Sequence, residues 1–207
     1  MTIISIEGID GAGKTTLIPR LAQHLISQGH TVHTHALPTP HGRREAQRYP
    51  QGSAACALAY ATDMAHLWET TINPASARGH IVILDRGPLS TAVYQSSGDL
   101  GTTGAANIAT MGCLNQWPDL TILLDIPPQE ARRRQIQRGG AEQDKATLAV
   151  LRRRYLEVSP SIPGALRTEF VRHDEEPSEV VDAVCGAVDR FLAGLRVIGA
   201  LYTCRFP

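Results

Sequence analysis

Short apolar runs alternate along the chain with longer stretches in which apolar residues recur every three or four positions. The short runs predict strands at Thr2–Glu7, Thr31–Ala36, Ile81–Leu84, Leu120–Leu124 and Glu169–Arg172. The stretches with helical spacing predict helices at Thr15–Gln28, Ser53–Ala77, Gly104–Gln116, Gln129–Arg138, Thr147–Val158 and Ser178–Leu195. Alternating strands and helices predict an α/β fold, in which helices cover both faces of a parallel sheet.

One segment follows neither pattern. Leu37–Gly52 is rich in proline, glycine and arginine, which predicts a loop. Long loops inside compact domains are usually functional, so this segment is a candidate part of a binding site.

Composition narrows the class of protein. The 207 residues, of which 43% are hydrophobic, suffice for one domain with a single core. Twenty basic residues balance twenty acidic ones, which argues against a binder of nucleic acid polymers. There is no apolar run long enough to span a membrane, and the sequence MTIISIEGID does not resemble a signal peptide, so we expect a cytoplasmic protein. The four scattered cysteines are expected to be thiols inside the fold.

A glycine-rich element directly follows the first predicted strand. It reads Gly8-Ile9-Asp10-Gly11-Ala12-Gly13-Lys14-Thr15, which is the G-x-x-x-x-G-K-T pattern of a phosphate-binding loop. Its backbone N–H groups and the following helix N-terminus favour phosphate oxygens. Lys14 would reach the β- and γ-phosphates of a nucleoside triphosphate, and the Thr15 hydroxyl would bind Mg²⁺.

The loop alone does not identify the phosphate acceptor. The sequence lacks the N-K-x-D element with which GTPases recognise guanine, and it is short for a mechanical ATPase. A small phosphotransferase needs an acceptor pocket, arginines for phosphate and a mobile cover, and the chain offers candidates for all three.

Four segments, of which the first contains this loop, together resemble the thymidylate kinase family: Ile3–Thr16, Tyr60–Ala75, Gly79–Gln95 and Pro118–Asp125. The distinctive features are D-G-A-G-K-T-T in the loop, and D-R at a strand end followed by L-S-T-x-x-Y-Q. This resemblance implies a nucleoside monophosphate kinase fold with a five-stranded parallel sheet. It also implies transfer of the γ-phosphoryl of ATP, with Mg²⁺, to a nucleoside 5′-monophosphate.

The resemblance also implies roles for individual residues. The ATP-binding residues would be Gly8, Asp10, Gly11, Ala12, Gly13, Lys14, Thr15 and Thr16. Thr15 and Asp85 would serve Mg²⁺, and the catalytic set would be Lys14, Asp10, Arg86, Arg134 and Arg138. The acceptor nucleotide would contact Tyr60, Met64, Arg86, Ser90, Thr91 and Gln95. A single kinase domain is expected over residues 1–195, with a lid around 132–146, a tail at 196–207 and possible homodimer formation.

The sequence departs from the family pattern mainly on the acceptor side. Met64 stands where the family usually has an arginine that contacts the base, and a thioether cannot donate a hydrogen bond. Gly87 replaces a larger residue after D-R, which would leave room near the sugar or base. These changes raise the hypothesis that the acceptor is dTMP, a related or 5-modified pyrimidine nucleotide, or one with a larger base. A P-loop kinase of another metabolite and a non-catalytic ATP-binding regulatory protein remain as alternatives.

Overall fold

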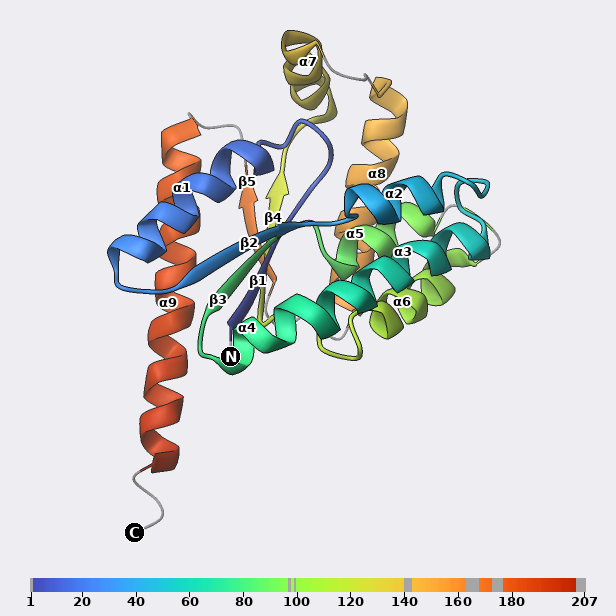
Figure 1. Cartoon of the computed structure of the whole chain (residues 1–207). Helices are drawn as coiled ribbons and strands as arrows, with labels where there is room; N and C mark the ends of the chain where they lie inside the picture. Colours follow the sequence, from blue (N-terminus) through green and yellow to red (C-terminus); the bar gives the residue numbers. More distant parts are fainter. Residues whose placement is uncertain are drawn as a thin grey trace.

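The computed structural model describes residues 2–96, 98, 100–139, 143–162, 168–172 and 177–203. Its centre is a five-stranded parallel sheet in the order β2-β3-β1-β4-β5 (Figure 1). The strands are β1 (Thr2–Glu7), β2 (Val32–Ala36), β3 (Ile81–Asp85), β4 (Leu120–Asp125) and β5 (Thr168–Arg172). The predicted α/β fold and parallel sheet are confirmed.

Helices cover both faces of this sheet. On one face lie α1 (Lys14–Ser27) and α9 (Pro177–Thr203), which pack against each other (Figure 1). The other face carries α3 (Ala54–Leu67), the π-helical turn η1 (Trp68–Ile72), α4 (Asn73–Ala77), α5 (Pro88–Gln95) and α6 (Gly101–Gly112). At the carboxyl ends of the strands α7 (Pro128–Arg138) leads into α8 (Lys145–Val158), and the 3₁₀ turn η2 (Ser159–Ser161) follows.

The alternation of side chains along β1 divides the core. Ile4 and Ile6 pack with Leu17 and Leu21 of α1 in the larger hydrophobic cluster. Ile3 belongs to a second cluster with Met64, Trp68, Ile72, Val82 and Leu84, which joins the sheet to α3 and η1. Because parallel strands are buried on both faces, these runs are continuously apolar.

Two predictions about local structure were wrong. The segment Leu37–Gly52 contains a helix, α2 (Pro40–Ala46), which Thr39 caps by accepting a hydrogen bond from the Gly42 N–H at 3.1 Å. The helix predicted over Ser53–Ala77 is interrupted by the π turn η1. Periodicity does not reveal such a turn, because five π-helical residues keep much the same apolar spacing.

The cysteines in the described part of the chain are free thiols, as expected: Cys56, Cys113 and Cys185 are all buried. Burial raises the pKa of Cys113 to about 12 and that of Cys185 to about 11, so neither is an effective nucleophile near neutral pH. Cys204 lies outside the described residues, as do 140–142 of the predicted lid. Of the helices that the structure describes, none combines the length and the apolar character that crossing a bilayer requires.

Candidate active site

The phosphate-binding loop joins β1 to α1 at the carboxyl edge of the sheet. Gly8, Gly11 and Gly13 have φ angles of 138°, 94° and 95°, a region that glycine adopts without strain. A Cβ on Gly8 would lie 2.7 Å from the Leu124 carbonyl oxygen, and one on Gly11 would overlap the Ala131 carbonyl. The loop therefore needs glycine both for its turns and for its close packing against β4 and α7.

Lys14 lies beneath this loop, with only 6% of its surface exposed. Its Nζ donates to the carbonyl oxygens of Gly8 and Ile9 at 2.9 and 3.1 Å. Burial, together with the nearby positive charge of Arg86, lowers the pKa of Lys14 to about 7. A polyanion bound at the loop would favour the charged form of Lys14.

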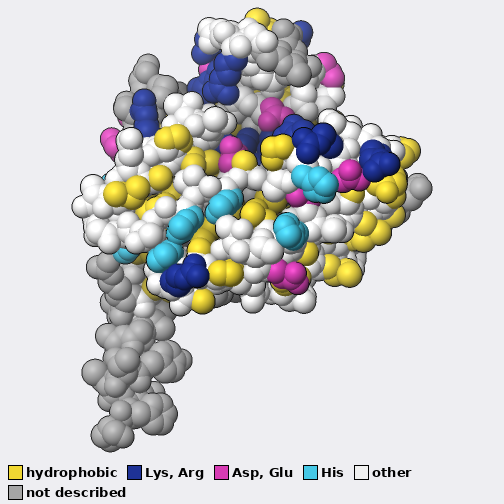
Figure 2. Space-filling view, viewed as in Figure 1, with side chains coloured by type: hydrophobic (Ala, Val, Ile, Leu, Met, Phe, Trp, Pro, Cys, Tyr) yellow, Lys and Arg dark blue, Asp and Glu magenta, His cyan; other side chains and the backbone are white. Residues whose placement is uncertain are grey.

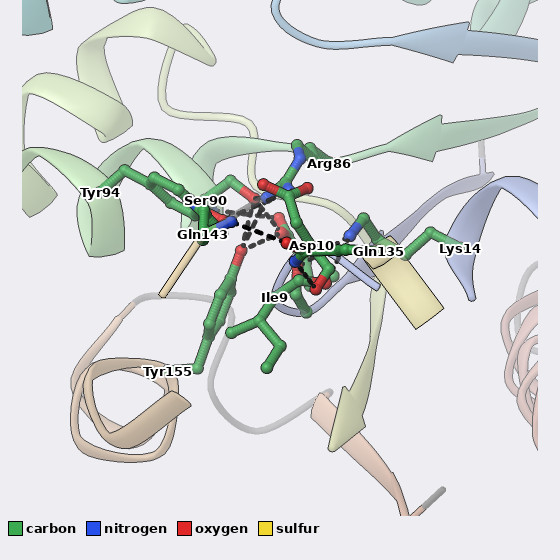
Figure 3. Close-up of polar contacts among 11 residues, drawn as sticks. Ile9, Asp10, Lys14, Arg86, Ser90, Tyr94, Gln135, Gln143 and Tyr155 are labelled. Atoms are coloured by element: carbon green, nitrogen blue, oxygen red, sulfur yellow. Dashed lines mark hydrogen bonds and ion pairs between the residues drawn. The ribbon is translucent and has the colours of Figure 1, made fainter. Parts of the chain in front are cut away.

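Arg86 stands at the end of β3 in the left-handed region, with φ of 70°, which is unusual for a residue other than glycine. Its guanidinium donates to Asp10 Oδ1 at 2.5 Å, to Ser90 Oγ at 3.2 Å and to the Tyr155 hydroxyl at 3.3 Å (Figure 3). It also lies 5.1 Å from the centre of the Tyr94 ring. These contacts fix the direction of a guanidinium whose side chain is 14% exposed.

Arg86 and Asp10 stabilise each other's charge. Burial opposes the charge of Arg86, but the surrounding Tyr155, Tyr94 and Asp10 hold its pKa well above the ordinary value. Burial likewise acts to raise the pKa of Asp10, but Arg86 and Lys14 outweigh it and lower that pKa. Asp10 thus orients Arg86.

Glu7 is a member of this cluster that sequence reasoning missed. The side chain is fully buried, and its Oε1 accepts from the backbone N–H groups of Gly87 and Ser90 at 2.9 and 3.3 Å. Its Oε2 accepts from Ser90 Oγ at 2.5 Å. The carboxylate therefore caps α5 and fixes the turn that carries Arg86, while its burial raises its own pKa. The available signal was a charged residue at the end of an otherwise uncharged, largely apolar strand.

Two cavities meet at this cluster. The donor cavity is lined by the phosphate-binding loop, including Gly11, Gly13, Lys14 and Thr15, and by Asp85 and Arg138. The acceptor cavity is lined by the predicted residues Tyr60, Met64, Ser90, Thr91 and Gln95. Both cavities share Asp10, Leu37, Pro38, Arg43 and Arg86, so the two binding volumes adjoin at a pair of arginines. Figure 2 shows further basic side chains on α7 and around the hollow beneath it.

Arg43 was not predicted as a site residue, because it lies in the segment read as a loop. It stands on α2, and α2 is held against α3 by Asp63, which accepts from Thr39 N at 2.8 Å and Thr39 Oγ1 at 2.5 Å. Gly42 allows this contact, since a Cβ there would overlap the Asp63 carboxylate. The arginines of Leu37–Gly52 were a signal, but their placement depends on a helix that the pattern did not show.

Helix α7 packs directly on the phosphate-binding loop. The buried Gln135 donates from Nε2 to the Asp10 carbonyl at 2.8 Å and accepts at Oε1 from Gln143 N at 2.9 Å (Figure 3). Three residues further on, Arg138 lines the donor cavity. Arg134 is engaged differently, since its Nε donates to Glu130 at 2.8 Å. No sequence signal distinguished Gln135 from the polar residues around it.

Other predicted residues do not line either cavity. Ala12 has no exposed surface and packs in the larger core cluster, while Gly8 is buried against β4. Thr16 is exposed in the first turn of α1. Gly87, by contrast, does line the acceptor cavity, but a Cβ there would point toward β1, 3.3 Å from Ser5 Cβ and 3.4 Å from Glu7 Oε1, so close packing against β1 also favours glycine at this position.

The donor cavity suits Mg²⁺ by its chemistry. The Thr15 hydroxyl and the Asp85 carboxylate would supply hard oxygen ligands of the kind that this ion prefers, beside the cavity expected to hold phosphates.

A glycine-rich phosphate loop, an adjoining second cavity and arginines between them, all at the carboxyl edge of a parallel sheet, define a P-loop nucleoside monophosphate kinase. A family model described as "Thymidylate kinase" matches residues 6–162. The chain belongs to the thymidylate kinase family, whose members are ATP-dependent kinases that use Mg²⁺.

Curated relatives named thymidylate kinase agree with this assignment. The chain is 39% identical over 155 residues to the protein from Thermoanaerobacter sp. (strain X514), covering 69% of this chain and 72% of the relative. It is 35% identical over 178 residues to that from Desulfotalea psychrophila, covering 83% and 84%. The protein from Caldanaerobacter subterraneus is 31% identical over 212 residues, covering 94% of this chain and 98% of the relative.

Proposed function

We propose that this kinase transfers the γ-phosphoryl of ATP to the 5′-phosphate of dTMP or of a related pyrimidine nucleotide, including 5-modified ones. The proposal rests on one observation: the donor and acceptor cavities adjoin, and Arg43 and Arg86 line both of them. Transfer requires two anions to approach each other, and two guanidinium groups at the junction offset their repulsion. The relatives' printed name supports dTMP as the acceptor.

On the donor side, the N–H groups of the loop residues that line the cavity, from Gly11 to Thr15, and the Lys14 ammonium would bind the ATP phosphates. Thr15 and Asp85 would hold Mg²⁺, which when bound neutralises charge on the phosphate oxygens. Asp10 serves through its contact with Arg86. The chain's own contribution is positioning and charge stabilisation, so no general base is assigned.

At the junction, Arg86 would clamp the acceptor phosphate with its planar guanidinium, which suits two oxygens at once. Arg138 reaches the donor cavity from α7 and would stabilise the transferring phosphoryl. Arg134, four residues earlier on the same helix, would assist once a bound nucleotide competes with Glu130 for it. This assigns the lid role to residues around 132–146 of a single kinase domain.

Along the acceptor cavity, Tyr60 would stack on the base, and Ser90, Thr91 and Gln95 would supply polar contacts from α5. Met64 contributes an apolar wall that suits a pyrimidine with a substituent at the 5-position. A kinase of some other metabolite, or a regulatory protein that binds ATP without transfer, would have no use for this combination. We also propose a cytoplasmic enzyme that forms a homodimer, with Leu58 of α3 and Met111 of α6 as exposed apolar candidates for the contact.

The test is ADP release with ATP and Mg²⁺ across a panel of nucleoside monophosphates that includes dTMP and 5-hydroxymethyl-dUMP. We expect turnover of pyrimidine deoxynucleotides, and a fall in kcat/KM of about 10²–10³-fold in Arg86→Met, as for loss of one charge-stabilising donor. Arg78→Met, which removes an exposed arginine at the C-terminal end of α4 that lines neither cavity, is the matched control. ATP binding without turnover of any nucleotide would contradict the proposal.

A further inference from the structure

The far end of the acceptor cavity differs in charge from the end that meets the donor cavity. The two cations that line the acceptor cavity, Arg43 and Arg86, also line the donor cavity, so both belong to the junction. The residues that line the acceptor cavity alone include Tyr60, Met64 and Gln95. Among the described residues, this far end therefore has no lysine or arginine.

Helix α5 runs from the junction to this far end. It begins directly after Gly87, next to Arg86, and its last residue is Gln95. At 1.5 Å per residue, the eight steps from Gly87 to Gln95 span about 12 Å, which is about the length of a nucleoside monophosphate. With the phosphate at Arg86, the base edge would lie at Gln95.

Gln95 carries an unsatisfied polar atom. Its side chain is only 3% exposed, and its Oε1 is buried with no hydrogen-bond partner in the described structure. A buried amide oxygen without a partner is destabilising, so a hydrogen bond from a ligand in the cavity would satisfy this atom. Met64, at 1% exposure, lines the same cavity with a thioether that imposes neither a donor nor a charge.

An amide side chain is symmetrical in shape but not in hydrogen bonding. It offers an oxygen acceptor beside an N–H donor, and a half-turn about its last bond exchanges the two. A 4-oxo pyrimidine such as thymine presents an acceptor at O4 and a donor at N3, whereas a 4-amino pyrimidine such as cytosine presents the reverse at N4 and N3. Gln95 can match either edge with two hydrogen bonds.

Discrimination between these edges needs a group that penalises one of them. A fixed cation at the far end would repel a 4-amino group and accept only a 4-oxo group, but the charges of this cavity lie at its other end. We infer that the base site reads pyrimidines through a reversible Gln95 amide and therefore accepts 4-amino as well as 4-oxo deoxynucleoside monophosphates. The inference rests on the proposed function and extends it to a second class of acceptor.

The test compares dTMP with 5-methyl-dCMP, which differ only at the base edge. We expect their kcat/KM values to agree within about tenfold, whereas a site with one fixed hydrogen-bonding polarity would separate them by about 10⁴-fold. A preference for dTMP above tenfold would overturn the inference and leave the kinase assignment intact. Turnover of neither would instead contradict the proposed function, and the inference would fall with it.

Substitution of Gln95 tests the role of its amide. Gln95→Glu presents acceptors only, whereas each base edge offers one donor and one acceptor, so the carboxylate meets one match and one repulsion on either edge. The value of kcat/KM should therefore fall by at least about tenfold for dTMP and for 5-methyl-dCMP alike. Gln95→Leu removes both hydrogen bonds and should lower kcat/KM for the two substrates by a similar factor. Gln47→Glu, which makes the same charge change at an exposed site on α2's C-terminal end, should leave kcat/KM for both substrates unchanged. Unchanged kcat/KM values in Gln95→Glu would overturn the inference, because they would mean that the Gln95 amide does not contact the base.

Discussion

Lys14 illustrates at the scale of one residue how burial prepares a group for its ligand. Its ammonium is held by the loop's own carbonyl oxygens, in a site where burial and Arg86 work against the charge. The pKa of about 7 lies far below the ordinary value of 10.5. The charge is therefore only half formed near neutral pH until an anion stabilises it.

ATP binding should consequently take up a proton. At pH 8 most free protein has neutral Lys14, and bound phosphates raise its pKa again, so binding adds up to about one proton and weakens as pH rises above 7. Calorimetry in buffers of different ionisation enthalpy measures this uptake. Lys145→Met, at the exposed second lysine, should retain it and Lys14→Met should lose it. Uptake near zero in the native protein would refute the argument.

Glu7 is the residue whose loss should damage the site most through the fold. Glu7→Ala removes the acceptor for two backbone N–H groups and leaves the buried Arg86 with one carboxylate fewer. We expect a loss of about 3 kcal/mol in the free energy of unfolding, measured by urea denaturation. Glu69→Ala, at an exposed position in η1, should cost less than about 0.5 kcal/mol. Equal losses in the two variants would show that the Glu7 network contributes little.

At the scale of elements, α2 shows how a short helix can be hidden in an irregular sequence. Proline at the first helical position after a Ser, Thr, Asp or Asn cap is a start signal, and Thr39-Pro40 provides it. This start signal alone did not predict the helix, because α2 has no apolar stripe that periodicity could reveal. Polar contacts with Asp63 of α3 hold α2 in place instead. The contact between α2 and α3 therefore stabilises a helix that the local sequence preferences did not determine.

Gly42→Ala tests this contact. In a helix, alanine is normally favoured over glycine by about 1 kcal/mol, but here the added Cβ would overlap the Asp63 carboxylate. We expect a lower melting temperature and a raised KM for the acceptor, because α2 carries Arg43. Gly194→Ala in α9, where a Cβ would meet no atom within 4 Å, should instead be neutral or stabilising. A stabilised Gly42→Ala would contradict the placement of α2 on α3.

At the scale of the whole molecule, α1 and α9 close one face of the sheet although they lie at opposite ends of the chain. Their contact combines buried Val184 and Val188 with a polar group, in which His24 and Gln28 face Asp189 at 3.0 and 3.1 Å. The apolar part should dominate, because the side chains of His24 and Asp189 are 30% and 39% exposed and solvent screens them.

Neighbouring substitutions separate these contributions. Val188→Ala should cost about 2 kcal/mol, since it removes fully buried methyl groups, whereas Asp189→Asn should cost less than about 1 kcal/mol. Denaturation of both variants under the same conditions measures the difference. A larger loss for Asp189→Asn would mean that the polar group, and not the core, holds α9 in place.

The sequence by itself determined the strands, most helices and the phosphate-binding loop. Buried parallel strands must be apolar throughout, and a backbone that wraps phosphate needs glycine at fixed positions, so both leave local patterns. Asp85, Arg86 and the polar positions of α5 were also within reach, since they follow a strand end.

Only the tertiary structure decided which side chains meet. Glu7, Arg43 and Gln135 join the site from β1, α2 and α7, and their distances from Arg86 along the sequence carry no information about contact. The same holds for the division of the acceptor cavity into a charged junction and an uncharged base end. Such features depend on how separate helices and strands pack together. The pattern of residues along the sequence reflects only the local requirements of each helix or strand.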